Sequence, residues 1–314
     1  MFARLRRVRA SIPATLALCL SVGFYLVGCD GGDSSNPPGG DGGSADGGGA
    51  GAAVEGGKDY MYAAEGFTLT ATTKTKLDLS SSQGAGTQQI TARSLIEAKP
   101  SGDKLELHGK VLELVDFVGT GQLDPEFIKK QAAEAGQEVP DMKAEIARSE
   151  AWMILDRKGE LDDVATDALA QNKVEDGPSD FGLFGLPDLP KVDLEVGKEV
   201  KIPTESDEKQ LAFAPITVPV EVDVTWVLRK VEGSVAELDV TVESSGATEI
   251  DAGGQTALVS TLEEAAFTIR FDLEAKVPVS IDGYQASETS LDIPGNPITI
   301  TMNTDISTVY EVGG

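Results

Sequence analysis

Apolar and polar residues alternate over long stretches of this chain, and this alternation limits the possible folds more than any other feature. In residues 67–79, Phe67, Leu69 and Leu79 share one face, while lysines, threonines and an aspartate share the other. Successive side chains of a β-strand point to opposite sides of the sheet, so a period of two predicts a strand with one buried face. The same pattern predicts strands over 89–99, 104–118, 151–156, 160–164, 219–229, 235–243, 266–276 and 298–311.

Short turn sequences join most of these segments, at 100–103, 157–159, 232–234 and 294–297. Near Gly109 the alternation changes phase, which predicts a β-bulge. Amphipathic strands with short connections favour an antiparallel sheet with one dry face, and that face must be buried. We therefore expect a mainly β fold with one or two short helices. Its antiparallel strands would form a strongly curved sheet, a half-barrel or two facing sheets.

Helices and one irregular apolar segment are expected beside the sheet. Asp124 and Pro125 suit the start of a helix over 124–136, and shorter helices are expected over 142–148 and 165–172. The segment 174–190 mixes Gly, Pro and Asp with large apolar residues, which favours an irregular segment packed on the core. The alternative is a lid over an apolar groove. The helix over 124–136 would take part in this lid. The apolar residues of the lid would be Phe127, Ile128, Phe181, Leu183, Phe184 and Leu186.

The N-terminal residues 1–28 have the pattern of a secretory signal peptide. Four arginines and no acidic residue precede an apolar run over 12–27. A basic segment before a short apolar segment is typical of such signals. The run is shorter than the roughly 20 residues that a membrane-spanning helix requires. We therefore expect a removable signal rather than a permanent transmembrane anchor.

The end of this segment, Leu26-Val27-Gly28-Cys29, resembles the lipobox of bacterial lipoproteins. In that family the cysteine receives a diacylglyceryl group on sulfur, the signal is cut before it, and the new amine is acylated. The resemblance implies these groups, such as palmitate, on Cys29, and no other cofactor. Several acyl chains hold a protein firmly on a membrane. The expected location is the cell envelope, at the outer membrane or cell surface. Asp30 leaves the inner membrane as an alternative, since it resembles the retention signal of enteric lipoproteins.

Three parts of the chain follow from these patterns. Residues 1–28 are the signal peptide, and 29–57 are the lipidated cysteine with a Gly-, Ser- and Asp-rich flexible tether. A tether of this length reaches roughly 30 Å. Residues 58–314 are the β-rich domain. Its two parts, about 58–173 and 195–314, show a loosely similar order of strands and turns, which suggests two similar halves.

Composition excludes several classes of function. Removal of 1–28 would leave Cys29 as the only cysteine, so no disulfide, cysteine metal site or cysteine nucleophile is expected. Four of the 26 basic residues and none of the 52 acidic ones lie in 1–28, so the net charge would fall from −26 to about −30. A charge this negative argues against nucleic acid and anionic lipid head groups as partners. It favours solubility, with an acidic site for a basic partner as the alternative.

The search for catalytic residues yields weak candidates. His108 is the only histidine, and a solvated strand position is expected for it. Ser101 and Lys104 have the Ser-x-x-Lys spacing of penicillin-interacting serine enzymes, but they lie in a turn instead of at the start of a helix. The carboxylate pairs Glu263-Glu264 and Asp162-Asp163 are expected by chance in so acidic a chain. We therefore predict neither an enzyme nor a metal site.

The domain also resembles two groups of bacterial lipoproteins. Its strand pattern is similar to the half-barrel of lipoprotein carriers, in which helices plug an apolar concavity. It also resembles uncharacterised β-rich envelope lipoproteins with an Asp-x-x-Gly hairpin, here 156–159, and later Leu-Pro and Val-Gly segments, here 189–190 and 196–197. The aromatic residue that often follows that Val-Gly is missing. The resemblances imply a fold and transfer no functional residue.

These observations lead to two functional hypotheses. The first is a membrane-anchored envelope lipoprotein with a non-catalytic structural or interaction role and an envelope protein as partner. The alternative is a binding module that holds a lipid or another amphipathic ligand in an apolar β-concavity. A packed interior would favour the first hypothesis, and a contiguous apolar cavity would favour the second.

Overall fold

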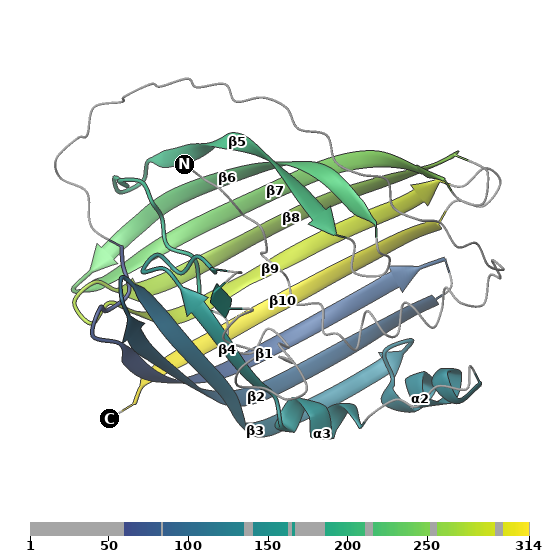
Figure 1. Ribbon diagram of the computed structural model, residues 1–314, viewed down its shortest axis with the longest axis horizontal. Coiled ribbons are helices and arrows are strands. Elements are labelled where there is room, and N and C mark those ends of the chain that lie inside the picture. Colours follow the sequence, from purple (N-terminus) through teal and green to yellow (C-terminus); the bar gives the residue numbers. More distant parts are fainter. Residues whose placement is uncertain are drawn as a thin grey trace.

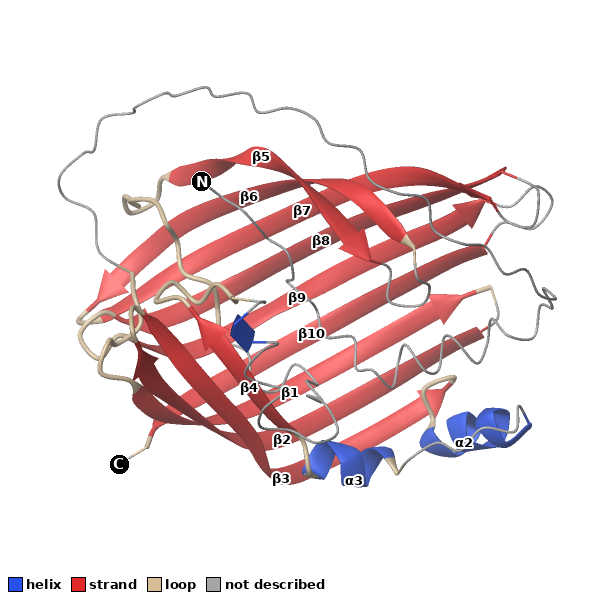
Figure 2. Cartoon of the chain, viewed as in Figure 1, coloured by secondary structure: helices blue, strands red, loops and turns tan. Residues whose placement is uncertain are grey.

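The computed structural model describes residues 60–82, 84–134, 141–162, 165–166, 186–210, 216–251, 256–292 and 298–313. In this part of the chain ten strands form one antiparallel sheet that is curved and not closed (Figure 1; Figure 2). The mainly β fold predicted from the sequence is therefore confirmed. The strands are β1 (Phe67–Ser81), β2 (Gly84–Ser101), β3 (Lys104–Gly121), β4 (Glu150–Leu155), β5 (Glu199–Gln210), β6 (Thr217–Glu232), β7 (Val235–Asp251), β8 (Thr256–Asp272), β9 (Val277–Asp292) and β10 (Ile298–Val312). The helices are α2 (Pro125–Glu134) and α3 (Met142–Ala147).

The sheet consists of two meanders that meet at a single seam. Its strand order is β4-β3-β2-β1-β10-β9-β8-β7-β6-β5, so β1–β4 and β5–β10 extend in opposite directions from the pairing of β1 with β10. Strands β4 and β5 form the two edges (Figure 1). The predicted halves 58–173 and 195–314 contain the four-stranded and the six-stranded meander, respectively. Similarity between these halves stays a prediction.

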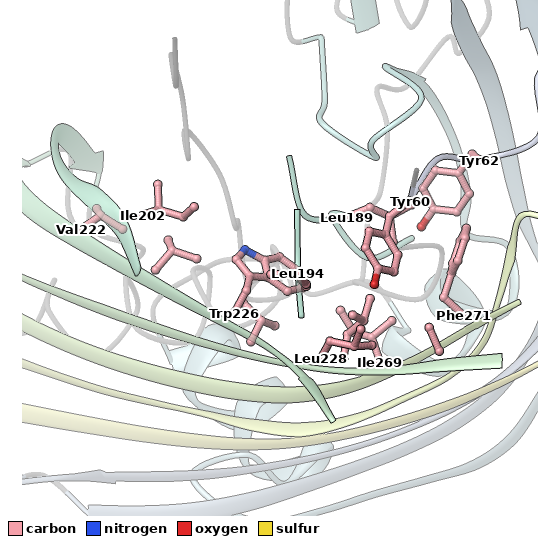
Figure 3. Packing of buried hydrophobic residues seen from close by; sticks show 14 of the residues in the cluster. Tyr60, Tyr62, Leu189, Leu194, Ile202, Val222, Trp226, Leu228, Ile269 and Phe271 are labelled. Carbon is pink, nitrogen blue, oxygen red and sulfur yellow. The ribbon is translucent and has the colours of Figure 1, made fainter. Parts of the chain in front are cut away.

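One face of the sheet, which we call the inner face, carries most of the core. In β6 the residues Val220, Val222, Val224, Trp226 and Leu228 are buried and alternate with more exposed ones, as the sequence predicts. Pairing carries this face across β7 and β8, where Leu228 aligns with Leu238 and Leu238 with Ile269. Figure 3 shows the strands curving beneath these side chains, so the inner face is concave.

Helices α2 and α3 cover one end of the inner face. Asp124 accepts a hydrogen bond from the Glu126 amide at 2.8 Å, and Asp141 caps α3 in the same way through the Lys143 and Ala144 amides. Such side-chain acceptors satisfy amides that the first helical turn leaves unpaired. The predicted helices over 124–136 and 142–148 are thus confirmed, with slightly shorter bounds. Their buried residues Ile128, Met142 and Ile146 pack on Ile90, Ala92, Phe117 and Ala151 of the sheet.

The hairpin 156–159 fastens two irregular segments over the other end of the inner face. Arg157 donates from Nε and Nη2 to the Tyr62 carbonyl oxygen, at 3.1 and 2.9 Å. Lys158 donates from Nζ to the Tyr60 carbonyl oxygen at 2.6 Å, and its own carbonyl accepts from the Leu189 amide. We call this arrangement the hairpin clamp. It satisfies backbone groups of segments that have no regular partner, which allows them to stay buried.

Gly159 gives the hairpin clamp its close fit. Its φ of +92° lies in the left-handed region, and an added Cβ would come within 2.6 Å of the Pro187 carbonyl oxygen. Only glycine tolerates both conditions. Asp156 closes the turn by accepting from the amides of Lys158 and Glu160 at 2.7 and 2.9 Å.

Several local expectations are wrong or incomplete. Strand β3 contains two bulges, near Leu112 and Val115, and not one near Gly109; each inserts an extra residue opposite β2. Of the strand predicted over 160–164, the described residues 160–162 form only an isolated bridge between Leu161 and Leu155, and 163–164 lie outside the described residues. Strand β8 begins ten residues before the predicted 266–276 and ends at Asp272. The turn predicted at 294–297 lies outside the described residues, and so does 167–172 of the third predicted helix.

Strands β5 and β9 were not expected. On the inner face β9 presents Gly283, Gln285, Ser287 and Thr289 between Ile281 and Leu291, so the middle of the strand lacks an apolar alternation. β5 is an edge strand with Pro203 beside a break in its register. Proline in a strand is tolerated at edges and bulges, where the missing amide donor is not needed. Hydrophobic periodicity therefore finds neither strand.

Truncation of two leucines in β3 should distinguish a buried inner-face position from an exposed position at a bulge. Leu107 is fully buried, whereas Leu112 is 50% exposed. Leu107→Ala should lower the free energy of unfolding by about 2–5 kcal/mol, because it leaves a cavity in the core. Leu112→Ala should change it by less than about 0.5 kcal/mol. Urea unfolding of the two variants measures both values, and equal effects would contradict the burial of Leu107 on the inner face.

Candidate functional site

The centre of the inner face holds a cluster of polar side chains beside the apolar residues of β6. It contains Glu263 and Thr261 of β8, Gln285 and Thr289 of β9, and Lys209 of β5, and we call it the inner polar cluster. Thr261 pairs in register with Thr289, and Ala265 with Gln285, which places these residues on the face that also carries Val259 and Ile269. Gln285, Thr261 and Thr289 are all less than 9% exposed.

Glu263 is the hub of the inner polar cluster. Its Oε1 accepts a hydrogen bond from Nε2 of Gln285, and its Oε2 forms an ion pair with Nζ of Lys209. The Glu263 side chain is only 13% exposed. A carboxylate this far from water needs a charged or hydrogen-bonding partner, and both of its oxygens have one. The arrangement leaves no free acid or base.

The position of this ion pair also reflects the curvature of the sheet. Lys209 and Glu263 lie on β5 and β8, with β6 and β7 between them in the strand order. The two side chains therefore meet across the concavity. Figure 1 shows β5 curling over the face that it shares with β6 and β7.

An apolar strip runs from the inner polar cluster along β6 toward the hairpin clamp. Val222, Val224, Trp226 and Leu228 form it, and each is less than 9% exposed. Ile202, Leu194, Leu189 and the two tyrosines Tyr60 and Tyr62 pack in the same cluster (Figure 3). The strip and the polar cluster together give the concave face an apolar part and a polar part.

Two buried tyrosines lie over the end of this strip. Tyr62 donates from Oη to the Pro187 carbonyl oxygen at 2.7 Å, and its ring makes an edge contact with Phe271. Burial, with the nearby Tyr310 and Asp188, raises the pKa of Tyr62 well above its usual value. Tyr60 is equally inaccessible to solvent, and its hydroxyl has no hydrogen-bond partner among the described residues. The sequence pattern gave no reason to single out either residue.

The residues expected to form a lid lie in different surroundings. Ile128 of α2 is buried on β2 and β3, whereas Phe127 is 41% exposed. Leu186 packs partly buried against the inner-face core. Phe181, Leu183 and Phe184 lie outside the described residues. Ile128 and Leu186 thus both contact the inner face, at separate places.

The sole histidine lies on the outer face. It is largely covered by other side chains, whereas a solvated position was expected. His108 stacks on Trp152 of the edge strand β4, with ring centroids 3.8 Å apart and planes within 10°. Its Nε2 contacts Glu150, and its Nδ1 lies 3.5 Å from Glu97. The His108 side chain is 15% exposed, because the tryptophan covers one face of its ring. These contacts fasten β4 to β3 and β2.

The remaining sequence candidates do not assemble into a site. Ser101 and Lys104 face each other across the β2–β3 hairpin, as the turn prediction requires, and Lys104 pairs with Asp162. Glu263 and Glu264 point to opposite faces, and Glu264 accepts a hydrogen bond from Tyr284 at 2.5 Å. Asp163 lies outside the described residues. Among the residues that are described, no group of three or more His, Cys, Asp or Glu is placed to hold a metal ion.

The N-terminal candidates cannot be placed, because Leu26, Val27, Gly28 and Cys29 lie outside the described residues. Within the described ranges, no helix combines the length and the hydropathy needed to cross a bilayer. The chain matches no family model, no curated protein and no solved structure in the comparisons.

A double-mutant cycle on Lys209 and Glu263 tests whether β5 is held over the inner face. With Lys209→Met and Glu263→Gln, we expect a coupling energy above about 1 kcal/mol, because Glu263 is only 13% exposed and Lys209→Met removes its one countercharge in the inner polar cluster. The matched control is Lys198 with Glu195, whose side chains are 63% and 77% exposed. That pair should couple by less than about 0.5 kcal/mol. Urea unfolding gives all the energies, and equal coupling in both pairs would refute the inward position of β5.

Proposed function

We propose that this chain is a non-catalytic binding module that holds an amphipathic ligand on its concave inner face. The observation that carries the proposal is the division of that face into an apolar strip along β6 and an inner polar cluster around Glu263. Ligand sites are typically concave and mostly apolar, with few polar groups that fix orientation. An acyl chain would lie along Val224 and Trp226, between the inner polar cluster and the hairpin clamp.

The proposed ligand is electrically compatible with this face. The charges of Glu263 and Lys209 compensate each other, and Gln285 and two threonines add neutral polar groups. Such a site favours neutral polar groups over a strongly charged head group. The high net negative charge of the chain argues in the same direction, against an anionic ligand.

We further propose that the module is anchored to a membrane of the bacterial cell envelope through Cys29. The support is the lipobox-like Leu26-Val27-Gly28-Cys29, preceded by a signal-like segment and followed by a Gly-rich stretch. Acyl groups on Cys29 would tether the domain near a bilayer, which is a source of acyl ligands. The outer membrane or the cell surface is the proposed site, with the inner membrane as the alternative that Asp30 suggests.

A structural or interaction role without a ligand is the second candidate. Two observations favour it. Each residue of the apolar strip is less than 9% exposed, as in a packed interior. The inner polar cluster also satisfies itself, since Glu263 has partners for both carboxylate oxygens. In this case β5 and the covering segments would complete a packed core, and an envelope protein would be the partner. Ligand uptake distinguishes the two candidates.

The two tryptophans offer an internal comparison for ligand uptake. The chain has two, Trp226 on the inner face and Trp152 on the outer face. A bromine atom quenches the fluorescence of a tryptophan that it contacts. Methyl ω-bromoundecanoate should therefore quench the fluorescence of the Trp152→Phe variant, which keeps Trp226. The same probe should leave the fluorescence of the Trp226→Phe variant, which keeps only Trp152, unchanged. Absence of saturable quenching in Trp152→Phe would exclude the binding function and leave the structural role.

The anchor is tested separately on Cys29. Cys29→Ser should abolish metabolic labelling with palmitate and release the protein from the membrane fraction, because the thiol that would carry the diacylglyceryl group is gone. Fractionation after expression in a bacterial host provides the measurement. Membrane association that persists in the variant would point to an uncleaved N-terminal helix instead.

A further inference from the structure

The Tyr60 hydroxyl is a buried donor that nothing described in the protein satisfies. Tyr60 is 0% exposed, and its Oη has no hydrogen-bond partner among the described residues. Tyr62, two residues further along and equally buried, donates to the Pro187 carbonyl oxygen. The two tyrosines share one segment and one hydrophobic cluster, so only the environment of the hydroxyl differs. Buried polar groups without a partner are rare and destabilising, and each calls for an explanation.

The Tyr60 hydroxyl cannot easily leave its position. Nζ of Lys158 donates to the Tyr60 carbonyl oxygen at 2.6 Å and also contacts the Pro190 carbonyl oxygen. The hairpin clamp therefore fixes the backbone on which the ring sits. In Figure 3 the hydroxyl points toward Leu228 and Ile269, which are part of the inner face. It is thus aimed at the end of the apolar strip.

The chemistry around the hydroxyl selects the kind of acceptor. Burial and the negative charge of Asp193 both raise the pKa of Tyr60, so the phenol stays protonated and acts as a donor. The same negative charge disfavours an anionic acceptor at this position. Leu189, Leu194 and Leu228 supply apolar surroundings in the same cluster. A neutral carbonyl oxygen attached to an aliphatic chain fits all of these conditions.

We propose that Tyr60 Oη donates a hydrogen bond to the neutral ester or amide carbonyl of an acyl ligand that lies on the apolar strip. This inference rests on the proposed binding function and adds the ligand class to it. The Tyr60 hydroxyl then binds the carbonyl at one end of the apolar strip, and the strip along Trp226 holds the acyl chain of the ligand. An acyl ester is bound in preference to a hydrocarbon or a free fatty acid anion of similar length.

The test compares three ligands in the Trp152→Phe background, where quenching of Trp226 reports binding. Methyl ω-bromoundecanoate carries the ester, bromododecane lacks a carbonyl, and ω-bromoundecanoate at neutral pH is the anion. Tyr60→Phe should weaken binding of the ester by about 3- to 10-fold, the range of one neutral hydrogen bond. Bromododecane should bind to Tyr60→Phe as tightly as before or more tightly. The anion should bind more weakly than the ester to the protein that retains Tyr60.

Tyr62→Phe is the matched control, since its hydroxyl already has a partner inside the protein. It should lower the melting temperature of the free protein and leave the ratio of ester to hydrocarbon affinity unchanged. Tyr60→Phe should instead raise that melting temperature, because it removes an unsatisfied buried hydroxyl, and should reduce the stabilisation that the ester gives.

The outcomes separate the two proposals. If bromododecane binds and Tyr60→Phe weakens the ester and the hydrocarbon equally or not at all, the carbonyl contact is refuted while the binding function stands. Preference for the anion over the ester would also refute it. If no probe quenches Trp226, the binding function fails and the Tyr60 assignment fails with it.

Discussion

The hairpin clamp is the interaction on which the inner face depends. A curved sheet with one dry face needs covering segments, and irregular segments bring backbone groups that must find partners before they can be buried. Arg157 and Lys158 supply these partners for the segment at Tyr60–Tyr62, and the Lys158 carbonyl does the same for Leu189. Three parts of the chain that are far apart in sequence are thereby locked together. Both buried tyrosines owe their positions to this contact.

The sequence was sufficient for the parts of the fold in which hydrophobic alternation is strong. Strands β1, β6 and β10 were predicted to within a few residues, and Asp124 caps the helix that was expected to begin there. β9 was missed because the middle of its inner face is small and polar, and β5 because Pro203 and charged residues conceal an edge strand. Alternation reports which residues face an apolar neighbour, so it cannot find a strand that contributes to a polar cluster.

Little of the candidate site could be predicted. The sequence placed Trp226 and Val224 on the buried face correctly, since they belong to an alternating strand. Glu263 was considered only with its neighbour Glu264, although alternation alone puts the two on opposite faces. Its true partners, Lys209 and Gln285, come from the two strands that were missed. The pairing of Lys209 with Glu263 also depends on how far β5 curls over β6 and β7, which no local pattern encodes.

The seam between β1 and β10 has a consequence for how the sheet folds. Pairs within each meander join strands that follow one another in the chain, but the seam joins residues such as Thr73 and Thr308, 235 positions apart. Contacts this distant form slowly, because a long loop must close first. β1 therefore keeps one hydrogen-bonding edge free until the end of the chain arrives. A long unpaired edge invites pairing with other chains, so newly made protein is most prone to aggregate before its last strand has joined the first.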